Sequence, residues 1–159
     1  MDSTYDITHD ISHIDWWQLA DIMARAPLFE RKPFDLARAF GNSDAVVFAY
    51  YEGNLVGAAR ALSDGAYYAS IFDVVVAPEH QGCGVGRRMV GALLAKLPVE
   101  RVFLTSVFGK EAFYERFGFL SQTNGMGRYA EPARGHALAS GVLTAVRTTS
   151  SLGATKSPN

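Results

Sequence analysis

The sequence predicts a mixed α/β fold built on one central sheet. Three apolar segments, at residues 45–51, 55–62 and 67–76, follow one another with short polar turns between them, which is typical of consecutive antiparallel strands. An amphipathic segment at residues 85–96 comes next, followed by an apolar run at residues 101–107. Because a crossover helix usually joins parallel neighbours, the sheet should contain both antiparallel and parallel pairs.

The N-terminal part predicts one short strand and two helices. The strand spans residues 5–11, where polar and apolar side chains alternate loosely. The first helix is capped by Ser12 or Asp15, carries an apolar face, and ends at Pro27. The second helix spans residues 33–41, with a proline in its first turn and a glycine at its end.

The C-terminal part predicts another short helix and strand. Residues 110–117 fit a two-turn helix, Gly118 fits a left-handed cap, and a strand is expected to follow from Phe119. From residue 131 onward the composition shifts to Ala, Gly, Ser and Thr. The apolar stretch at residues 137–146 is expected mainly to be a disordered or loose tail, with three alternatives: an edge strand, a helix, or a contact with a partner subunit. The whole sheet is expected to have six to seven strands, with about four flanking helices.

Length and composition limit the class of protein. The chain has 159 residues, with 15 Lys and Arg against 16 Asp and Glu. This length predicts one domain, placed at residues 1–130, with a partly disordered tail at residues 131–159. The balanced charge argues against nucleic acid or an anionic membrane as partner, and no apolar run reaches the length of a membrane span. A single cysteine, Cys83, suits a reducing compartment, so we expect a cytoplasmic protein.

A glycine-rich connection joins the long strand at residues 67–76 to the helix at residues 85–96. It contains Gly82, Gly84 and Gly86. Glycine accepts a positive φ and keeps side chains away from a ligand, and the first N–H groups of a helix have no partner within the helix. The connection therefore predicts an anion site, for which a pyrophosphate is the usual ligand.

The spacing of this loop excludes two common phosphate-binding patterns. No Gly-Lys-Ser/Thr follows, as a Walker loop requires. A dinucleotide fingerprint needs an earlier glycine, but this chain has Gln81 there. It also needs an acidic residue at the end of a second strand about 20 residues later, and this chain has none. The pattern Gln81-x-x-Gly84-x-Gly86 instead resembles motif A of the GNAT superfamily of N-acetyltransferases.

A second motif resembles the same family. Residues 113–119 read Phe-Tyr-x-x-x-Gly-Phe, similar to motif B, in which a tyrosine protonates the departing coenzyme A thiolate. In this chain that residue is Tyr114. The two motifs occur in the family's order, and the resemblance covers about residues 5–129. It implies the GNAT fold and acetyl-CoA as co-substrate.

The resemblance also implies how acetyl-CoA is held. In the family the loop amides bind the pyrophosphate, while the end of the central strand pairs with the pantetheine arm and offers an N–H to the oxyanion. The residues expected to bind acetyl-CoA are Val74, Val75, Val76, Gln81, Gly82, Cys83, Gly84, Val85, Gly86 and Arg87. No metal is expected, since His9, His13 and His136 lack metal-ligand spacing.

The general base stays open at this stage. Asp73 is the nearest carboxylate, but the alternation of a regular strand turns it away from Ser70 and Phe72 unless a bulge intervenes. Three alternatives stand: Asp73 as base, Asp73 in a structural role, or deprotonation through ordered water.

The acceptor is expected to be a small hydrophobic or aromatic primary amine. An aromatic acceptor site is predicted from Phe29, Phe34, Tyr67, Tyr68, Phe72 and Tyr129, with Ser70 as a further position facing the amine. A polyamine would require an acidic pocket. Two alternatives are kept: acetylation of a protein lysine or N-terminus, and a non-catalytic acyl-CoA-binding module, against which the presence of Tyr114 argues. The protein is expected to be a monomer or a homodimer.

Overall fold

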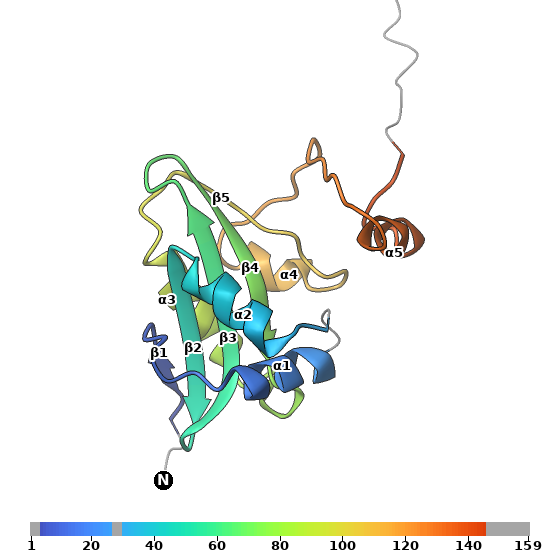
Figure 1. The fold of residues 1–159 in the computed structure, drawn as a ribbon. Coiled ribbons are helices and arrows are strands. Elements are labelled where there is room, and N and C mark those ends of the chain that lie inside the picture. Colours follow the sequence, from blue (N-terminus) through green and yellow to red (C-terminus); the bar gives the residue numbers. More distant parts are fainter. Residues whose placement is uncertain (1–3, 27–29, 146–159) are drawn as a thin grey trace, which may run out of the picture. The chain divides into compact units, whose positions relative to one another are not determined.

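The computed structural model describes residues 4–26 and 30–145 (Figure 1). The chain divides into two compact units, Met1–Phe119 and Leu120–Asn159. Among the described residues, the first unit contains one mixed sheet of five strands with helices α1 to α4, and the second contains α5. This arrangement confirms the predicted α/β class with a mixed sheet.

The sheet has the order β1-β2-β3-β4-β5. The first four strands are antiparallel to their neighbours, and β4 and β5 are parallel, as the crossover helix predicts. The strands are β1 (Asp6–Thr8), β2 (Ala45–Tyr51), β3 (Asn54–Ser63), β4 (Tyr68–Val76) and β5 (Arg101–Phe103).

The helices lie close to the positions that the sequence predicts. Asp15 is the cap of the first one, because its carboxylate accepts the N–H groups of Trp17 and Gln18 at 3.0 Å. Pro27, expected to end that helix, lies outside the described residues. The helices are α1 (Trp16–Arg25), α2 (Pro33–Gly41), the 3-10 turn η1 (Pro78–His80), α3 (Val85–Leu94), α4 (Glu111–Glu115) and α5 (Ala133–Ala139).

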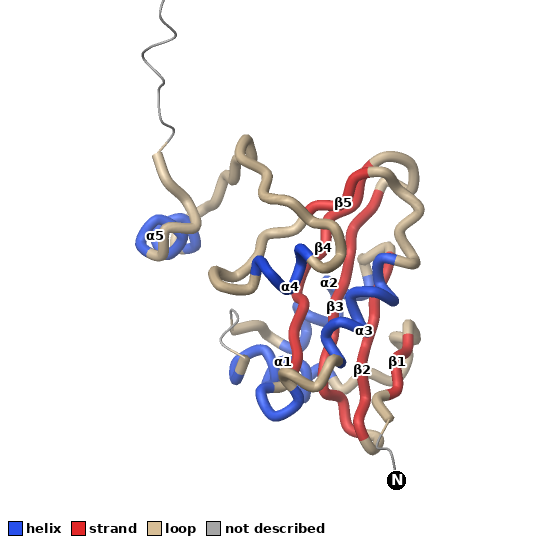
Figure 2. Tube along the Cα trace, turned by 180° about the vertical axis from the view of Figure 1, so that it is seen from behind, coloured by secondary structure: helices blue, strands red, loops and turns tan. Residues whose placement is uncertain are grey.

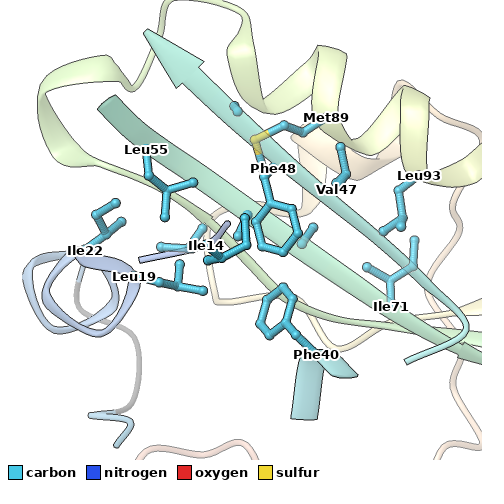
Figure 3. Close-up of a cluster of buried hydrophobic side chains, with 14 of the residues drawn as sticks. Ile14, Leu19, Ile22, Phe40, Val47, Phe48, Leu55, Ile71, Met89 and Leu93 are labelled. Carbon is cyan, nitrogen blue, oxygen red and sulfur yellow. The ribbon is translucent and has the colours of Figure 1, made fainter. Parts of the chain in front are cut away.

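Helices cover both faces of the sheet. Figure 1 shows α1 and α2 in front of it, and Figure 2, from behind, shows α3 on the opposite face. Phe40 of α2 stacks on Phe48 of β2 with ring centroids 5.4 Å apart, while Met89 and Leu93 of α3 are fully buried (Figure 3). The core therefore holds β2 to β4 from two sides and fixes the strand that leads into the glycine loop.

Four sequence predictions about strands need correction. The first strand was expected at residues 5–11, but β1 spans only Asp6–Thr8. The described residues form five strands, not six to seven, and β5 ends at Phe103 instead of residue 107. No strand follows Gly118, since residues 119–130 form only a turn and irregular chain. Leu120 and Met126 are 89% and 85% exposed, so this segment buries no apolar face of the kind that stabilises a strand. Helix α5 contains only residues 137–139 of the apolar stretch at 137–146, and residues 140–145 form turns and irregular chain.

No helix in residues 4–26 or 30–145 combines the length and the apolar character needed to cross a membrane.

Candidate active site

The parallel strands β4 and β5 are paired only over a short distance. Their register begins with Tyr68 opposite Arg101 and ends with Ser70 opposite Phe103. Beyond that point, the carboxyl half of β4 has no strand on this side within the described chain. Backbone groups on such an edge are available to an extended ligand, which can bind as an added strand does. The backbone of residues 74–76 therefore has no partner strand on this side among the described residues.

The loop after β4 presents backbone N–H groups. Gly82 and Gly84 have φ angles of 77° and 83°, which residues with a Cβ adopt at a cost. Gly84 is the N-cap of α3, and no side chain caps this helix, so the amides of its first turn have no capping partner. The Gln81 side chain donates to the carbonyl of Val76 at 3.0 Å and ties the loop back to β4. This geometry is that of an anion site.

Side chains from three other elements hold the turn η1 that precedes the loop. The Tyr5 hydroxyl lies 3.1 Å from Nδ1 of His80, and the His80 ring packs on Tyr51 with centroids 4.9 Å apart. Arg25, at the end of α1, donates to Glu79 at 2.8 Å and lowers the pKa of that carboxyl. The position of the loop therefore depends on contacts far away in the sequence.

The loop, the end of β4 and the region of α4 enclose an open cleft of about 550 Å³. Phe113 and Phe117 form part of an apolar wall. Three cationic side chains, Arg87, Lys110 and Arg116, also line the cleft, and its lining among the described residues includes no carboxylate. Such a cleft suits a ligand with an apolar arm and an anionic end.

Tyr114 of α4 lines the same cleft. Its ring packs edge-on against Phe113 and Phe119, with centroids 4.9 and 6.1 Å away. Burial raises the pKa of the Tyr114 hydroxyl above its ordinary value, because the ionised form would be poorly solvated. The hydroxyl therefore keeps its proton at neutral pH and is able to donate it.

All but two of the residues predicted to bind the cofactor line the cleft. Cys83 is exposed, with Sγ 3.7 Å from the Gln81 carbonyl, and Val85 is buried in the core. Neither of these side chains lines the cleft, although the amides of both belong to the loop. The predicted residues that do line it are Val74, Val75, Val76, Gln81, Gly82, Gly84, Gly86 and Arg87.

Several lining residues were not predicted from the sequence. They come from separate segments that only the fold brings together, although the spacing of Phe113 and Phe117 on one helical face was a usable signal for the apolar wall. These residues are Ala26, His80, Val107, Lys110, Phe113, Arg116 and Phe117.

A second surface adjoins β4 and consists of Tyr68, Ser70, Phe72 and Phe103, which we call the aromatic surface. The β4 residues that alternate with the first three are buried, so the first three face the other way. Tyr68 and Phe103 stack with ring centroids 6.0 Å apart. All three aromatic side chains are partly exposed.

Asp73 lies in a β-bulge. Ala59 of β3 stands opposite both Asp73 and Val74 of β4, because the register between these strands shifts here. Asp73 has a φ of 52°, and its Oδ2 accepts the Nε–H of Arg60 at 2.6 Å. The bulge that would turn Asp73 toward the face of Ser70 and Phe72 is thus present. The carboxylate is bound to an arginine, and its role as a general base stays a prediction.

The residues predicted for the acceptor site do not meet in one described cavity. Phe29 lies outside the described residues, and Tyr129 belongs to the second unit. Phe34 and Tyr67 are 79% and 62% exposed, and the other three, Tyr68, Ser70 and Phe72, belong to the aromatic surface. None of those described is part of the cleft lining. The acceptor site therefore stays a prediction.

No cluster of three or more His, Cys, Asp and Glu side chains in the described ranges is arranged to hold a metal ion.

The chain is similar to acetyltransferases in sequence. The model of the Acetyltransferase (GNAT) family matches residues 10–119. GCN5-related N-acetyltransferase 1, chloroplastic, from Arabidopsis thaliana is 31% identical over 114 residues, which are 69% of this chain and 58% of the relative. Serotonin N-acetyltransferase 2, chloroplastic, from Oryza sativa subsp. japonica is 32% identical over 113 residues, 67% of this chain and 56% of the relative. The chain thus spans little more than half the length of these relatives.

A solved structure shares the fold. The crystal structure of an acetyltransferase assigned to the GNAT family from Xanthomonas campestris superposes with a TM-score of 0.71 at 25% identity, covering 80% of this chain and 94% of the other. The family match spans the glycine loop, the unpaired end of β4 and α4. This chain belongs to the GNAT acetyltransferase family.

Proposed function

We propose that this protein transfers the acetyl group of acetyl-CoA to a primary amine. The observation that carries the proposal is the cleft, in which unpaired strand backbone, an uncapped glycine loop, three cations and Tyr114 meet. Each feature matches one part of the cofactor: an extended amide-containing arm, a pyrophosphate, further phosphate, and a leaving thiolate. Family membership supports the same activity.

The chain's residues would hold acetyl-CoA mainly through the backbone. Backbone N–H groups of residues 82–87 would donate hydrogen bonds to the pyrophosphate at the N-terminus of α3. The unpaired edge of residues 74–76 would hydrogen-bond the pantetheine arm as an added strand. Arg87, Lys110 and Arg116 would neutralise phosphate charge in the cleft. No metal takes part in this scheme.

The reaction needs one proton donor at the leaving group. The lone pair of a neutral amine attacks the thioester carbonyl carbon, the C–S bond breaks, and the thiolate takes the proton of the Tyr114 hydroxyl. The nitrogen loses its extra proton to water, and solvent reprotonates Tyr114. The raised pKa of Tyr114 keeps the donor protonated at neutral pH, as a general acid requires.

We infer that the acceptor is a small hydrophobic or aromatic amine. The aromatic surface supports this, because Tyr68, Phe72 and Phe103 offer partly exposed rings beside the strand that ends in the cleft. The rice relative named serotonin N-acetyltransferase 2 supports the same class of acceptor. A cytoplasmic location, and a monomer or homodimer as the oligomeric state, stay predictions.

A protein amine is the second candidate. Phe34, Tyr67 and Phe72 are exposed and line no described cavity, which suits an open surface for a lysine or an N-terminus. A non-catalytic acyl-CoA-binding module would use the same cleft but would leave Tyr114 without a role.

The test is a panel of amines with acetyl-CoA, in which release of coenzyme A thiol is measured. Tryptamine and phenylethylamine should exceed spermidine and a lysine-containing peptide in kcat/KM. Preference for the peptide by tenfold or more would favour the protein acceptor. Calorimetric binding of acetyl-CoA with no turnover on any amine would favour the binding module.

A further inference from the structure

The bulge in β4 holds its central residue in a conformation that few side chains adopt. Asp73 has a φ of 52°, and in the described chain the only other non-glycine residue with a positive φ is Glu52, in the hairpin turn after β2. Such residues persist when surrounding contacts hold them, and they cluster at functional sites. The contacts of Asp73 therefore indicate what the bulge is for.

Two arginines engage the Asp73 carboxylate. Arg60 of β3 donates from Nε to Oδ2 at 2.6 Å, and Nη2 of Arg31 lies 3.8 Å from Oδ1. The Arg60 and Asp73 side chains are only 16% and 14% exposed, so water screens their attraction weakly. The Arg60 guanidinium also lies over the Phe72 ring, 5.1 Å from its centroid. The pair is thus held in one geometry.

This ion pair acts on the register of the strand. Arg60 stands directly opposite Phe72, so the two side chains share a face, and the bond to Arg60 brings Asp73 to that face as well. A regular strand would send consecutive residues to opposite faces. Removal of the extra residue would exchange the faces of every later position, including Val74 and Val75. Val75 is now buried against Ala58, and residues 74–76 line the cleft.

We propose that Arg60 and Asp73 are positioning residues, whose ion pair holds the β4 bulge and thereby sets the backbone of residues 74–76 against the cofactor. Of the alternatives for Asp73, the proposal selects the structural role. A carboxylate that is ion-paired with Arg60 orients the strand and takes no proton from the acceptor. The effect on turnover rests on the proposed function, while the effect on the backbone does not.

The experiment compares substitutions by their tolerance of positive φ. Asn adopts this conformation more readily than Ala and can accept the Arg60 N–H, but it cannot act as a base. Asp73→Asn should lower kcat by about threefold or less, whereas Asp73→Ala should lower it by about tenfold or more. Asp73→Gly, which relieves the strain without the ion pair, should fall between them.

The pH profile and the partner residue separate positioning from proton transfer. All three variants should keep the shape of the wild-type profile of kcat/KM, including its acidic limb. Arg60→Met should match Asp73→Ala, Arg60→Lys should recover part of the loss, and the double variant should add little, because one interaction is removed.

Glu52 offers a matched control, since its φ is 50° and its side chain is exposed outside the cleft. Glu52→Ala and Glu52→Asn should differ in thermal stability but leave kcat unchanged. If Asp73→Asn is as slow as Asp73→Ala and the acidic limb disappears, Asp73 is the base and the proposal is wrong. Wild-type turnover in Asp73→Ala would also overturn it.

A backbone measurement keeps the test independent of the reaction. In NMR spectra the amides of residues 74–76 should move strongly in Asp73→Ala and little in Asp73→Asn. Amides that stay in place in Asp73→Ala would show that the ion pair does not hold the bulge. If the wild-type protein acetylates no amine while these shifts occur as expected, the proposed function fails and the positioning role stands.

Discussion

The cleft and the aromatic surface lie beside the same strand but are built from different parts of the chain. In the cleft, glycines with positive φ and the unpaired end of β4 present backbone groups, so recognition depends little on which side chains are present. On the aromatic surface, Tyr68, Phe72 and Phe103 present partly exposed rings. The backbone groups of the cleft suit a cofactor that the whole family shares. The side chains of the aromatic surface suit an acceptor that varies between proteins.

The difference predicts two kinds of variant. A change in the cleft should affect the reaction with every amine to the same degree, because each reaction uses the same acetyl donor. A change on the aromatic surface should alter the ranking of amines and leave cofactor binding as it was. Acetyl-CoA affinity and the relative rates with two amines therefore distinguish the two kinds of variant.

Tyr114→Phe should have the largest effect. The ring that packs against Phe113 and Phe119 is kept, while the proton donor is lost. General acid catalysis contributes about 10²- to 10⁴-fold, so kcat should fall within that range, which is roughly 3 to 5 kcal/mol in barrier. The loss should be equal for tryptamine and for an aliphatic amine, as steady-state kinetics can show.

The pH profile provides the control for this variant. Because burial raises the pKa of Tyr114 above that of an ordinary tyrosine, activity should fall only at strongly alkaline pH, as the pH rises through that pKa. This alkaline limb should shift or vanish in Tyr114→Phe. Full turnover with an unchanged profile would assign the proton to water or to the cofactor thiol.

Gly84→Val should have the next largest effect, on cofactor affinity. The new side chain is strained at a φ of 83° and stands beside the uncapped amides of α3. Loss of two charge-assisted hydrogen bonds, at roughly 1.5 kcal/mol each, corresponds to about 10²-fold weaker acetyl-CoA binding. Isothermal titration calorimetry would measure this change.

Gly53→Val is the matched control. Gly53 has a φ of 78°, and a Cβ there would meet no atom within 4 Å, but it lies in the β2–β3 hairpin and not in the cleft. Both variants should lose thermal stability, and only Gly84→Val should lose affinity. Equal affinity in the two variants would remove the loop from the binding site.

The sequence predicted the backbone groups of the cleft better than the side chains that line it, for a physical reason. Gln81, Gly84 and Gly86 are close together in the chain, and their conformations follow from local chemistry. Lys110 and Arg116 were not predicted as cleft residues, because their place in the cleft depends on how α4 lies relative to β4. A site formed by backbone groups can thus be predicted from a short motif. The side chains that distant segments bring to the site become known only from the fold.

Two features of the strands show the same limit. The bulge at Asp73 depends on the register between β3 and β4, and the sequence of one strand alone does not determine that register. The strand expected after Gly118 is absent, because a local pattern of apolar residues does not produce a strand unless a partner and a core face are available. Leu120, which such a strand would contain, is instead almost fully exposed.

The smallest expected effect is that of a substitution on the aromatic surface. It tests most directly whether this surface and the cleft bind different substrates. Phe72→Leu keeps an apolar side chain but removes the ring beside the bulge. An aromatic contact contributes about 0.5 to 1.5 kcal/mol beyond its buried area, so kcat/KM for tryptamine should fall by about two- to tenfold. The value for an aliphatic amine such as butylamine should change little, and calorimetry should show unchanged acetyl-CoA affinity.

Phe34→Leu is the comparison for that variant, since Phe34 was predicted for the same site but its side chain is 79% exposed on α2. If the surface as described binds the acceptor, Phe34→Leu should leave both amines unaffected. An equal loss of tryptamine selectivity in both variants would mean that α2 approaches β4 when the acceptor binds. Equal losses for both amines in Phe72→Leu would instead mean that Phe72 supports the bulge through its contact with Arg60, and that the acceptor's ring binds elsewhere.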